Sequence, residues 1–402
     1  MTNNEVPEHL QQPEIRRIQP IPSADSEGRP IIHLRDPFML AKDRMLAVPM
    51  AAMQAIQLFD GKHDLEGIAK AVKRSEADIL TLAENMDEAG LIWGPTCDRL
   101  ESELKTDLET TGHFPMRQSR VLGDSDEAAR GRIRTWINDT EDPEIEGEIK
   151  GLVVPRLDYN AMWPVYAGAY HTVRSAAIDH VLLLGCNHAG LGDGVILTRF
   201  GFESPLGVIN SDNEFTNQLT EMLGSSALNN QLDHITEHGP EMQVPWIQEC
   251  LGSEVPVTAA LVPDPLAPVG DLDPDAVSHA EFAKAARSVI ENISGRTLVI
   301  AAVDLSHAGP QAGEPRPVDE QRRFDVERTD RELLGQFING TSEGLLDEAR
   351  RTNNPTRWSG LGPMTMILDI LKPEQIELID YRQMMLDQKG TAMVTDASLA
   401  LT

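Results

Sequence analysis

A chain of 402 residues, 41% of them hydrophobic, is longer than one minimal domain and too apolar to be disordered, so we expect two domains. The 64 acidic residues outnumber the 35 basic residues and leave a net charge of −29, which repels nucleic-acid phosphates and anionic lipid headgroups. The composition therefore indicates an acidic protein that has neither nucleic acid nor membranes among its partners.

Two absences in the sequence bear on the cellular compartment. The chain has no run of about 18 apolar residues, and residues 1–20 are polar and rich in proline, unlike a signal peptide. The three cysteines (Cys97, Cys186 and Cys250) form no CxxC pair, so neither a disulfide framework nor a structural zinc site is expected. These features predict a cytoplasmic protein with reduced thiols.

The first part of the chain predicts an arm followed by a small helical domain. Residues 1–30 carry five prolines among polar side chains, so we expect a flexible arm. Over residues 31–95, an apolar stretch at 45–59 ends at a turn, a helix is predicted over 65–72, and another helix opens at Ser75. The Ser75 segment SEAD resembles a capping box with Asp in place of Glu. Three short helices followed by LIW suggest a winged-helix-like module.

Residues 96–150 are strongly charged, and only the stretch 127–137 (EAARGRIRTWI) predicts a helix. We therefore expect a charged linker with one helix between the two domains.

From residue 151 onward, short β-rich apolar runs alternate with helix-length segments. Strands are predicted at 151–155, 180–185, 195–200, 255–263, 296–304, 376–381 and 391–401, and helices near 164–177, 214–223, 238–250, 276–292, 318–337, 341–351 and 362–371. This succession predicts an α/β fold over residues 151–402, with a mixed, mostly parallel sheet and helices on both faces. Functional sites in such folds lie beyond the carboxyl ends of the strands.

Several chemistry-bearing side chains follow predicted strands. His188 comes after LLLGCN, and Asp304 and His307 come after LVIAAV. His238 and Glu241 lie in DHITEHGPEMQVPW, where Gly239-Pro240 favours a loop up to Gly239 and a helix that starts at Pro240. Imidazoles and carboxylates are metal ligands and proton carriers, so these residues are candidates for catalysis or metal binding.

Common catalytic motifs are missing. The sequence contains no GxGxxG after a strand, no GxxxxGK[ST], no GxSxG and no HExxH. Dinucleotide binding, P-loop chemistry, α/β-hydrolase chemistry and zincin chemistry are therefore not indicated by motif.

Four motifs in order carry a resemblance to a known family. GCNHAG at 185–190, SPLGVINSD at 204–212, TEHGPEMQVPWI at 236–247 and VDLSHAG at 303–309 have the order and spacing of the Memo family, which includes the bacterial AmmeMemoRadiSam system protein B. The resemblance covers roughly residues 150–402. It implies the fold of class III extradiol dioxygenases and suggests a radical-SAM enzyme as a pathway partner. RDPFML and QLFDGKHDLEGIA resemble the small winged-helix-like module that precedes the Memo domain in some bacterial members.

The resemblance also implies a pocket in which copper or iron is held by two His and one Cys. His188 matches one of these positions, but Arg156 in PRLDY and Ser359 in WSGLGPM stand at the other two. A guanidinium is no neutral ligand, and a serine hydroxyl is a poor substitute for a thiolate. The neighbouring family residues are kept as Asp304 and His307, and the family's EH..E segment is kept as Glu237, His238 and Glu241.

Two hypotheses follow, and they differ in class. In one, His188 and His307 with Asp158 or Asp304 form a rebuilt site for Fe or Cu in an oxidoreductase, and Arg156 binds a substrate carboxylate. In the other, which we favour slightly, the metal site is degenerate. The pocket then binds a small-molecule or peptide ligand, and the protein acts as an accessory component of a multi-protein pathway.

Overall fold

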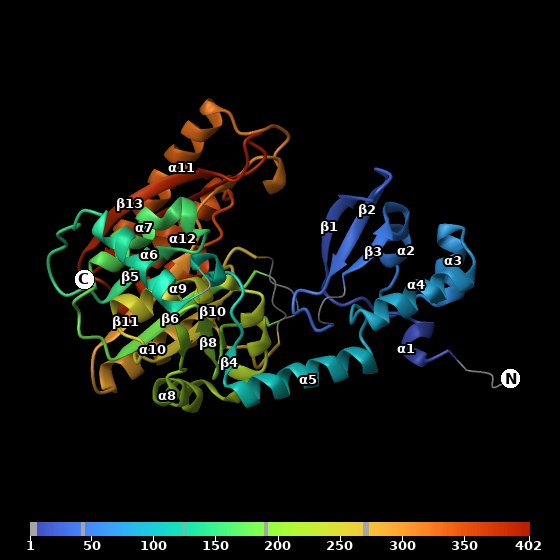
Figure 1. Cartoon of the computed structure of the whole chain (residues 1–402), viewed down its shortest axis with the longest axis horizontal. Helices are drawn as coiled ribbons and strands as arrows, with labels where there is room; N and C mark the ends of the chain where they lie inside the picture. The colour runs from blue at the N-terminus through green and yellow to red at the C-terminus, as the bar shows by residue number, and fades with distance from the viewer. Residues whose placement is uncertain (1–5, 42–44, 124, 189–191, 268–272) are drawn as a thin grey trace. The chain divides into compact units, whose positions relative to one another are not determined.

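The computed structural model describes residues 6–41, 45–123, 125–188, 192–267 and 273–402. The chain divides into two compact units, residues 1–111 and residues 112–402 (Figure 1). No helix in these described ranges is long and apolar enough to cross a membrane.

The first unit combines helices with a small antiparallel sheet. Its helices are α1 (Glu8–Gln11), α2 (Met53–Ile56), α3 (Leu65–Val72), α4 (Glu76–Glu88) and α5 (Pro95–Thr111), and its strands are β1 (Gln19–Ala24), β2 (Pro30–Arg35) and β3 (Leu46–Pro49). The strands lie in the order β1-β2-β3. Leu34, Ile68, Ala83 and Met86 are fully buried in its core. The predicted capping box is confirmed. The Ser75 side chain accepts a hydrogen bond from the backbone amide of Asp78, and the Asp78 side chain accepts one from the backbone amide of Ser75.

The prediction of a flexible arm over residues 1–30 is wrong for residues 6–30. Residues 1–5 lie outside the described residues. β1 pairs with β2 along its whole length, and buried Arg16 donates a hydrogen bond to the carbonyl of Gly90 and lies 3.3 Å from Asp36. Prolines are tolerated in an edge strand such as β1, so the proline content misled the prediction. The domain is also less helical than expected, because the segment predicted as helical from residue 45 opens with β3.

The second unit is an α/β domain. Its strands are β4 (His113–Phe114), β5 (Gly151–Pro155), β6 (His180–Cys186), β7 (Ile196–Leu197), β8 (Gly201–Ser204), β9 (Gly207–Ile209), β10 (Val257–Val262), β11 (Thr297–Val303), β12 (His307–Ala308), β13 (Ile376–Met385) and β14 (Met393–Leu401). Its helices are α6 (Asp126–Asn138), α7 (Tyr159–His171), α8 (Asn213–Leu223), α9 (His238–Cys250), α10 (His279–Asn292), α11 (Glu320–Ile338), α12 (Ser342–Thr352) and α13 (Leu361–Leu371).

The main sheet is mixed, as predicted, and has the order β12-β14-β5-β11-β6-β10-β7 with β13 paired to β14. Parallel pairing is confined to its four central strands, β5, β11, β6 and β10. The flanking strands β14, β7, β12 and β13 pair antiparallel, so the sheet is less parallel than expected. The carboxyl ends of the four central strands consequently meet at one edge of the sheet.

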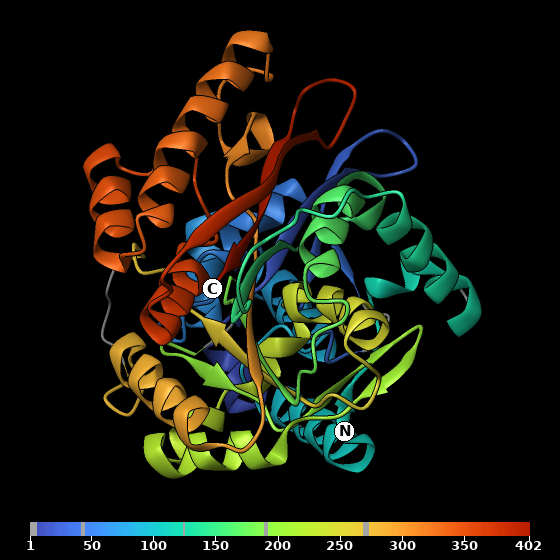
Figure 2. The same ribbon diagram turned by 90° about the vertical axis from the view of Figure 1, so that its left-hand side faces the viewer.

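Helices cover both faces of this sheet. Leu184 of β6 belongs to the core cluster that contains α13 and α10, whereas a side chain at the next residue, Gly185, would meet Pro240 of α9 at 2.9 Å. Because successive strand residues face opposite sides, α13 and α9 lie on opposite faces. Helix α7 packs beside α9, and α11 runs along β13 (Figures 1 and 2).

The helix predicted at 127–137 is confirmed as α6, but the linker character expected over residues 96–150 is wrong. α5 occupies residues 95–111, and the residues from 112 onward belong to the second unit. Trp136 of α6 stacks on Trp246 of α9 with ring centroids 5.9 Å apart, and Ile133 is fully buried. The amphipathic face of α6 therefore completes the core of the α/β unit.

Candidate functional site

Three candidate residues directly follow neighbouring central strands. Arg156 comes immediately after β5, Asp304 immediately after β11, and His188 two residues after β6. The last two residues of the GCNHAG motif, 189 and 190, lie outside the described residues. The strand order therefore gathers side chains that are far apart in the sequence, as predicted from the alternation of strands and helices.

Arg156 is the centre of the site. It is 8% exposed, its Nε donates to Oδ2 of Asp304 at 2.7 Å, and its Nη1 lies 3.7 Å from Oε2 of Glu237. Burial disfavours the charged guanidinium, but the carboxylates of Asp304 and Glu237 outweigh this effect and raise the pKa of Arg156. A permanent positive charge is thus fixed at this position.

Glu237 links Arg156 to His188. Its Oε1 accepts from the backbone amide of His188 at 2.5 Å, and its Oε2 lies 3.1 Å from His188 Nδ1. Although burial favours the neutral acid, the hydrogen bonds from His188 and the charge of Arg156 hold the pKa of Glu237 below its usual value. A carboxylate at Nδ1 orients the imidazole and places the proton on that nitrogen.

His307 and Ser359 form a second pair. His307 Nε2 lies 3.2 Å from Ser359 Oγ and 3.9 Å from Oδ2 of Asp304. Burial and the charge of Arg156 lower the pKa of His307, although Asp304 opposes the shift, so the site favours its neutral imidazole. Ser359 immediately precedes Gly360, the N-cap residue of α13.

Four of these residues line one cavity of about 560 Å³. The wall includes the predicted site residues Arg156, His188, His307 and Ser359. The wall also includes four polar residues that were not predicted from the sequence: Asp264, Gln311, Asn354 and Arg357. Asn354 and Arg357 adopt positive φ angles in the NNPTRWSG segment, where the Asn-Asn-Pro sequence was the available sign of a tight turn.

Four other predicted site residues, Asp304, Asp158, Glu241 and His238, lie elsewhere than in the cavity wall, and Asp304 is the one bonded to Arg156. Asp158 is the N-cap of α7 and accepts from the amide of Asn160. Oε1 of Glu241 accepts from the Ser119 hydroxyl and the amides of Arg117 and Ser119, so Glu241 anchors the segment before α6.

His238 is the first residue of α9 and is not a loop residue. Glu237 stands at the N-cap position without a capping hydrogen bond from its side chain, and Pro240 fits in the first turn of the helix, where no intrahelical N–H is needed. Burial, with the charge of Arg156, lowers the pKa of His238 to about 4. The expected start at Pro240 is therefore wrong by two residues.

The residues at the implied metal positions do not fit copper or iron. Arg156 places a cation where a neutral ligand is needed, and Ser359 offers a hydroxyl in place of a thiolate. Asp304, the remaining hard donor, is bonded to Arg156. In the described ranges, no group of three or more His, Cys, Asp and Glu side chains is arranged to hold a metal ion.

A buried carboxyl lies behind the site. Asp396 of β14 is fully buried, and both of its carboxyl oxygens, like Oδ1 of Asp304, lack a hydrogen-bond partner among the described residues. Burial raises the pKa of Asp396 well above its usual value, and the neighbouring Asp304 carboxylate adds to the rise.

This geometry predicts how pH affects the Asp396→Asn variant. A carboxyl whose pKa is raised by folding stabilises the protein below its unfolded pKa of 3.8, and this stability is lost as pH rises through the folded pKa. Between pH 3.8 and the folded pKa, the free energy of unfolding falls by up to about 1.4 kcal/mol per pH unit. We expect Asp396→Asn to be more stable than the parent at pH 8, with the difference shrinking toward pH 5. Chemical denaturation at several pH values measures this difference, and a difference that is constant with pH contradicts the assignment.

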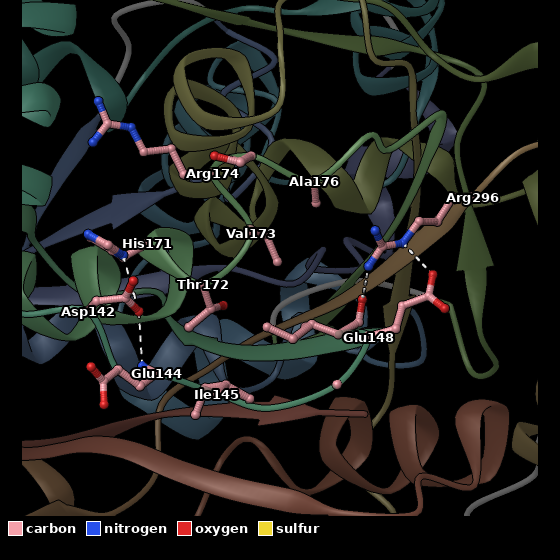
Figure 3. A pocket seen from close by; sticks show the side chains of 13 residues that line it. Asp142, Glu144, Ile145, Glu148, His171, Thr172, Val173, Arg174, Ala176 and Arg296 are labelled. Carbon is pink, nitrogen blue, oxygen red and sulfur yellow. Dashed lines mark hydrogen bonds and ion pairs between the residues drawn. The ribbon is translucent and has the colours of Figure 1, made fainter.

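A second cavity, of about 740 Å³, lies at the amino ends of β5, β6 and β11. Figure 3 shows Arg296 beside Glu148 and His171 beside Asp142 in its wall. Arg296 Nε lies 2.9 Å from Glu148 and its Nη2 donates to the carbonyl of Ile149, while His171 Nδ1 lies 3.8 Å from Asp142. Ligand sites of open α/β sheets lie at the carboxyl ends of the strands, so we place the candidate site in the other cavity.

Comparison with known proteins agrees with the resemblance read from the motifs. Residues 121–399 match the sequence model of the family described as Memo-like protein. A MEMO1 family protein of Aquifex aeolicus (strain VF5) is 25% identical over 358 residues, covering 87% of this chain and 90% of the relative. A MEMO1 family protein of Methanothermobacter thermautotrophicus is 30% identical over 241 residues, covering 58% of this chain and 77% of the relative. The family match begins 30 residues before the predicted domain start, and the Aquifex match is longer than the second unit, so it includes part of the first.

Proposed function

The chain belongs to the Memo-like protein family, and on that premise we propose that it binds a small anionic ligand in the cavity at the carboxyl ends of the central strands. The single observation that carries this proposal is the position of Arg156, which lines the cavity with its guanidinium clamped from behind by Asp304 and Glu237. A guanidinium held in this way is preorganised for a carboxylate or a phosphate group.

The charges around the cavity support an anionic ligand. Among the described residues, its wall carries two guanidinium groups, Arg156 and Arg357, and two imidazoles, His188 and His307, against one carboxylate, Asp264. Asp304 and Glu237 are 1% and 4% exposed and do not belong to the wall, so they compensate Arg156 from the protein side. A ligand would therefore meet mainly donors and cations.

The same donor set argues against the competing oxidoreductase. A redox metal needs converging neutral or anionic ligands, whereas the guanidinium at residue 156 is a cation without a free lone pair and the hydroxyl at residue 359 is a poor substitute for a thiolate. We accordingly propose a binding or accessory role with a degenerate metal pocket. The separate hydrophobic core of the first unit supports a division of labour, in which that unit contacts a protein partner.

Calorimetric titration with inorganic phosphate and, separately, with succinate tests the proposed anion site. We expect at least one of the two to bind the parent protein. Arg357→Ala removes one charged donor at the cavity wall, which is worth about 1.5 to 3 kcal/mol, so the dissociation constant should rise about tenfold or more.

Arg328→Ala is the matched control, since Arg328 is an exposed arginine of α11 that lies outside this cavity. Its affinity should equal that of the parent. Absence of heat with both anions, or equal weakening by the two variants, overturns the assignment of the anion site.

A further inference from the structure

We propose that Ser359 is a nucleophile whose hydroxyl is activated by His307, so that the cavity can transfer an acyl group from an ester to this serine and then to water. The inference deepens the proposed function, because it rests on the same cavity and assigns it the ester of an anionic compound as substrate class. It requires no metal ion.

The two reacting atoms are in hydrogen-bond contact. Ser359 Oγ lies 3.2 Å from His307 Nε2 and 3.4 Å from the carbonyl oxygen of Asp304, so the imidazole is its closer polar neighbour. Both side chains line the cavity, which a substrate can therefore enter without opening the core. A hydroxyl beside an imidazole at this distance is the arrangement in which the imidazole accepts the hydroxyl proton.

Backbone contacts on both sides of the pair fix its geometry. The amide of His307 donates to the carbonyl of Thr356 at 2.7 Å, and the amide of Ser359 donates to the carbonyl of Leu305 at 3.2 Å. His307 is also paired with Val394 of β14. The hydroxyl and the imidazole are thus held by two rigid segments, as a catalytic pair requires.

The pair is a dyad and not a Ser-His-Asp triad. In the described part of the chain, the carboxylate nearest to His307 is that of Asp304, which approaches the same Nε2 atom and already accepts from Arg156. A triad carboxylate would lie at Nδ1 instead. Arg156 is available to hold the anionic group of the substrate, and Ser359 lies at the amino end of α13, where a developing oxyanion is favoured.

The proposed step balances as follows. Ser359 Oγ forms a bond to the carbonyl carbon while its proton passes to His307 Nε2, and the ester C–O bond breaks as that proton moves to the departing alcohol. Water then attacks the acyl-serine and gives one proton to His307, which passes it to Ser359 Oγ as the acyl–Oγ bond breaks, so that the acid is released and the serine hydroxyl is restored. The overall reaction is hydrolysis, with no oxidant or reductant.

Covalent labelling of the full chain with diisopropyl fluorophosphate tests the nucleophile. Attack by Ser359 Oγ on phosphorus expels fluoride and leaves one diisopropylphosphoryl group, which intact-mass and peptide mass spectrometry locate. We expect one adduct, on Ser359. Ser359→Ala should abolish it, whereas the control Ser225→Ala, at a serine exposed on another part of the second unit, should not.

His307→Gln tests the base, because it keeps the serine but removes the proton acceptor. Labelling should slow by about 100-fold or more, the usual contribution of a positioned general base. The melting temperatures of all variants are compared with that of the parent. If Ser359→Ala fails to fold, Ser359→Cys provides a nucleophile of similar size, and iodoacetamide should alkylate its thiol at residue 359.

Two results overturn the proposal: no adduct on Ser359, or equal labelling rates in the parent and a folded His307→Gln variant. The phosphate titration remains an independent measure. If phosphate binds but no adduct forms, only the assignment of Ser359 as a nucleophile is overturned. If an adduct forms but neither anion binds, only the proposed anion-binding function is overturned.

Discussion

Replacing Arg156 by alanine should lower the free energy of unfolding of the second unit by about 3 to 5 kcal/mol, the usual cost of removing one partner from a buried ion pair. Arg156 is 8% exposed, and its loss leaves the carboxylate of Asp304, 1% exposed, without its ion-pair partner. Denaturation in guanidinium chloride measures the change by tryptophan fluorescence, since four of the five tryptophans lie in this unit.

The double variant Arg156→Met with Asp304→Asn provides the control. It removes both charges while keeping similar side-chain volumes, so it should recover more than half of the lost stability. A single-variant loss below about 1 kcal/mol, or a double variant no more stable than Arg156→Ala, contradicts the buried pair as the cause.

The sequence predicted the α/β unit well because its strands are buried on both faces. A strand covered on both sides needs a nearly continuous apolar run, and the run GLVVP coincides with β5 at residues 151–155. By contrast, β1 has the sequence QPIPSA, with two prolines and mostly exposed residues, a pattern that also describes a flexible arm. Only pairing with β2, a tertiary contact, distinguishes the two states.

Strand ends located His188 and His307, because position relative to a strand is readable from the sequence. Arg156 and Ser359 were identified through the family resemblance, and all four residues line the same cavity. Glu241 was a less successful candidate, since its role depends on a segment more than a hundred residues away in the chain. Contacts of such separation leave no local pattern, so single-sequence reasoning does not identify them.

Asp330 shows the same limit. It lies in the charged stretch ERTDRE of α11, which indicates a solvated helix face, yet the residue is fully buried. Its Oδ1 accepts from the Ser306 hydroxyl and from Trp358 Nε1, and its Oδ2 accepts from the hydroxyls of Tyr381 and Thr395 at 2.7 Å each. Burial raises the pKa of Asp330, and these four donors oppose the rise. The carboxylate therefore joins α11, β13 and β14 to the loops that carry His307 and Ser359.

Asp330→Ala should lower the free energy of unfolding by about 3 to 5 kcal/mol, because each buried donor left without an acceptor costs about 1 to 3 kcal/mol and the hydroxyls partly rearrange. Asp330→Asn should cost only about 1 kcal/mol, since a single hydrogen bond contributes that much. The amide oxygen can still accept from Trp358 Nε1, which cannot reverse its role, while the hydroxyls of Tyr381 and Thr395 can accept from the amide NH₂.

The contrast between the two variants identifies the mechanism. Equal losses for Asp330→Ala and Asp330→Asn would show that the negative charge, and not the number of acceptors, stabilises this site. Losses below about 1 kcal/mol for both would show that the four donors find other partners. The expected order places Asp330 as the hydrogen-bond hub behind the cavity, so Asp330→Ala should also slow labelling of Ser359, which depends on the loops that this hub holds.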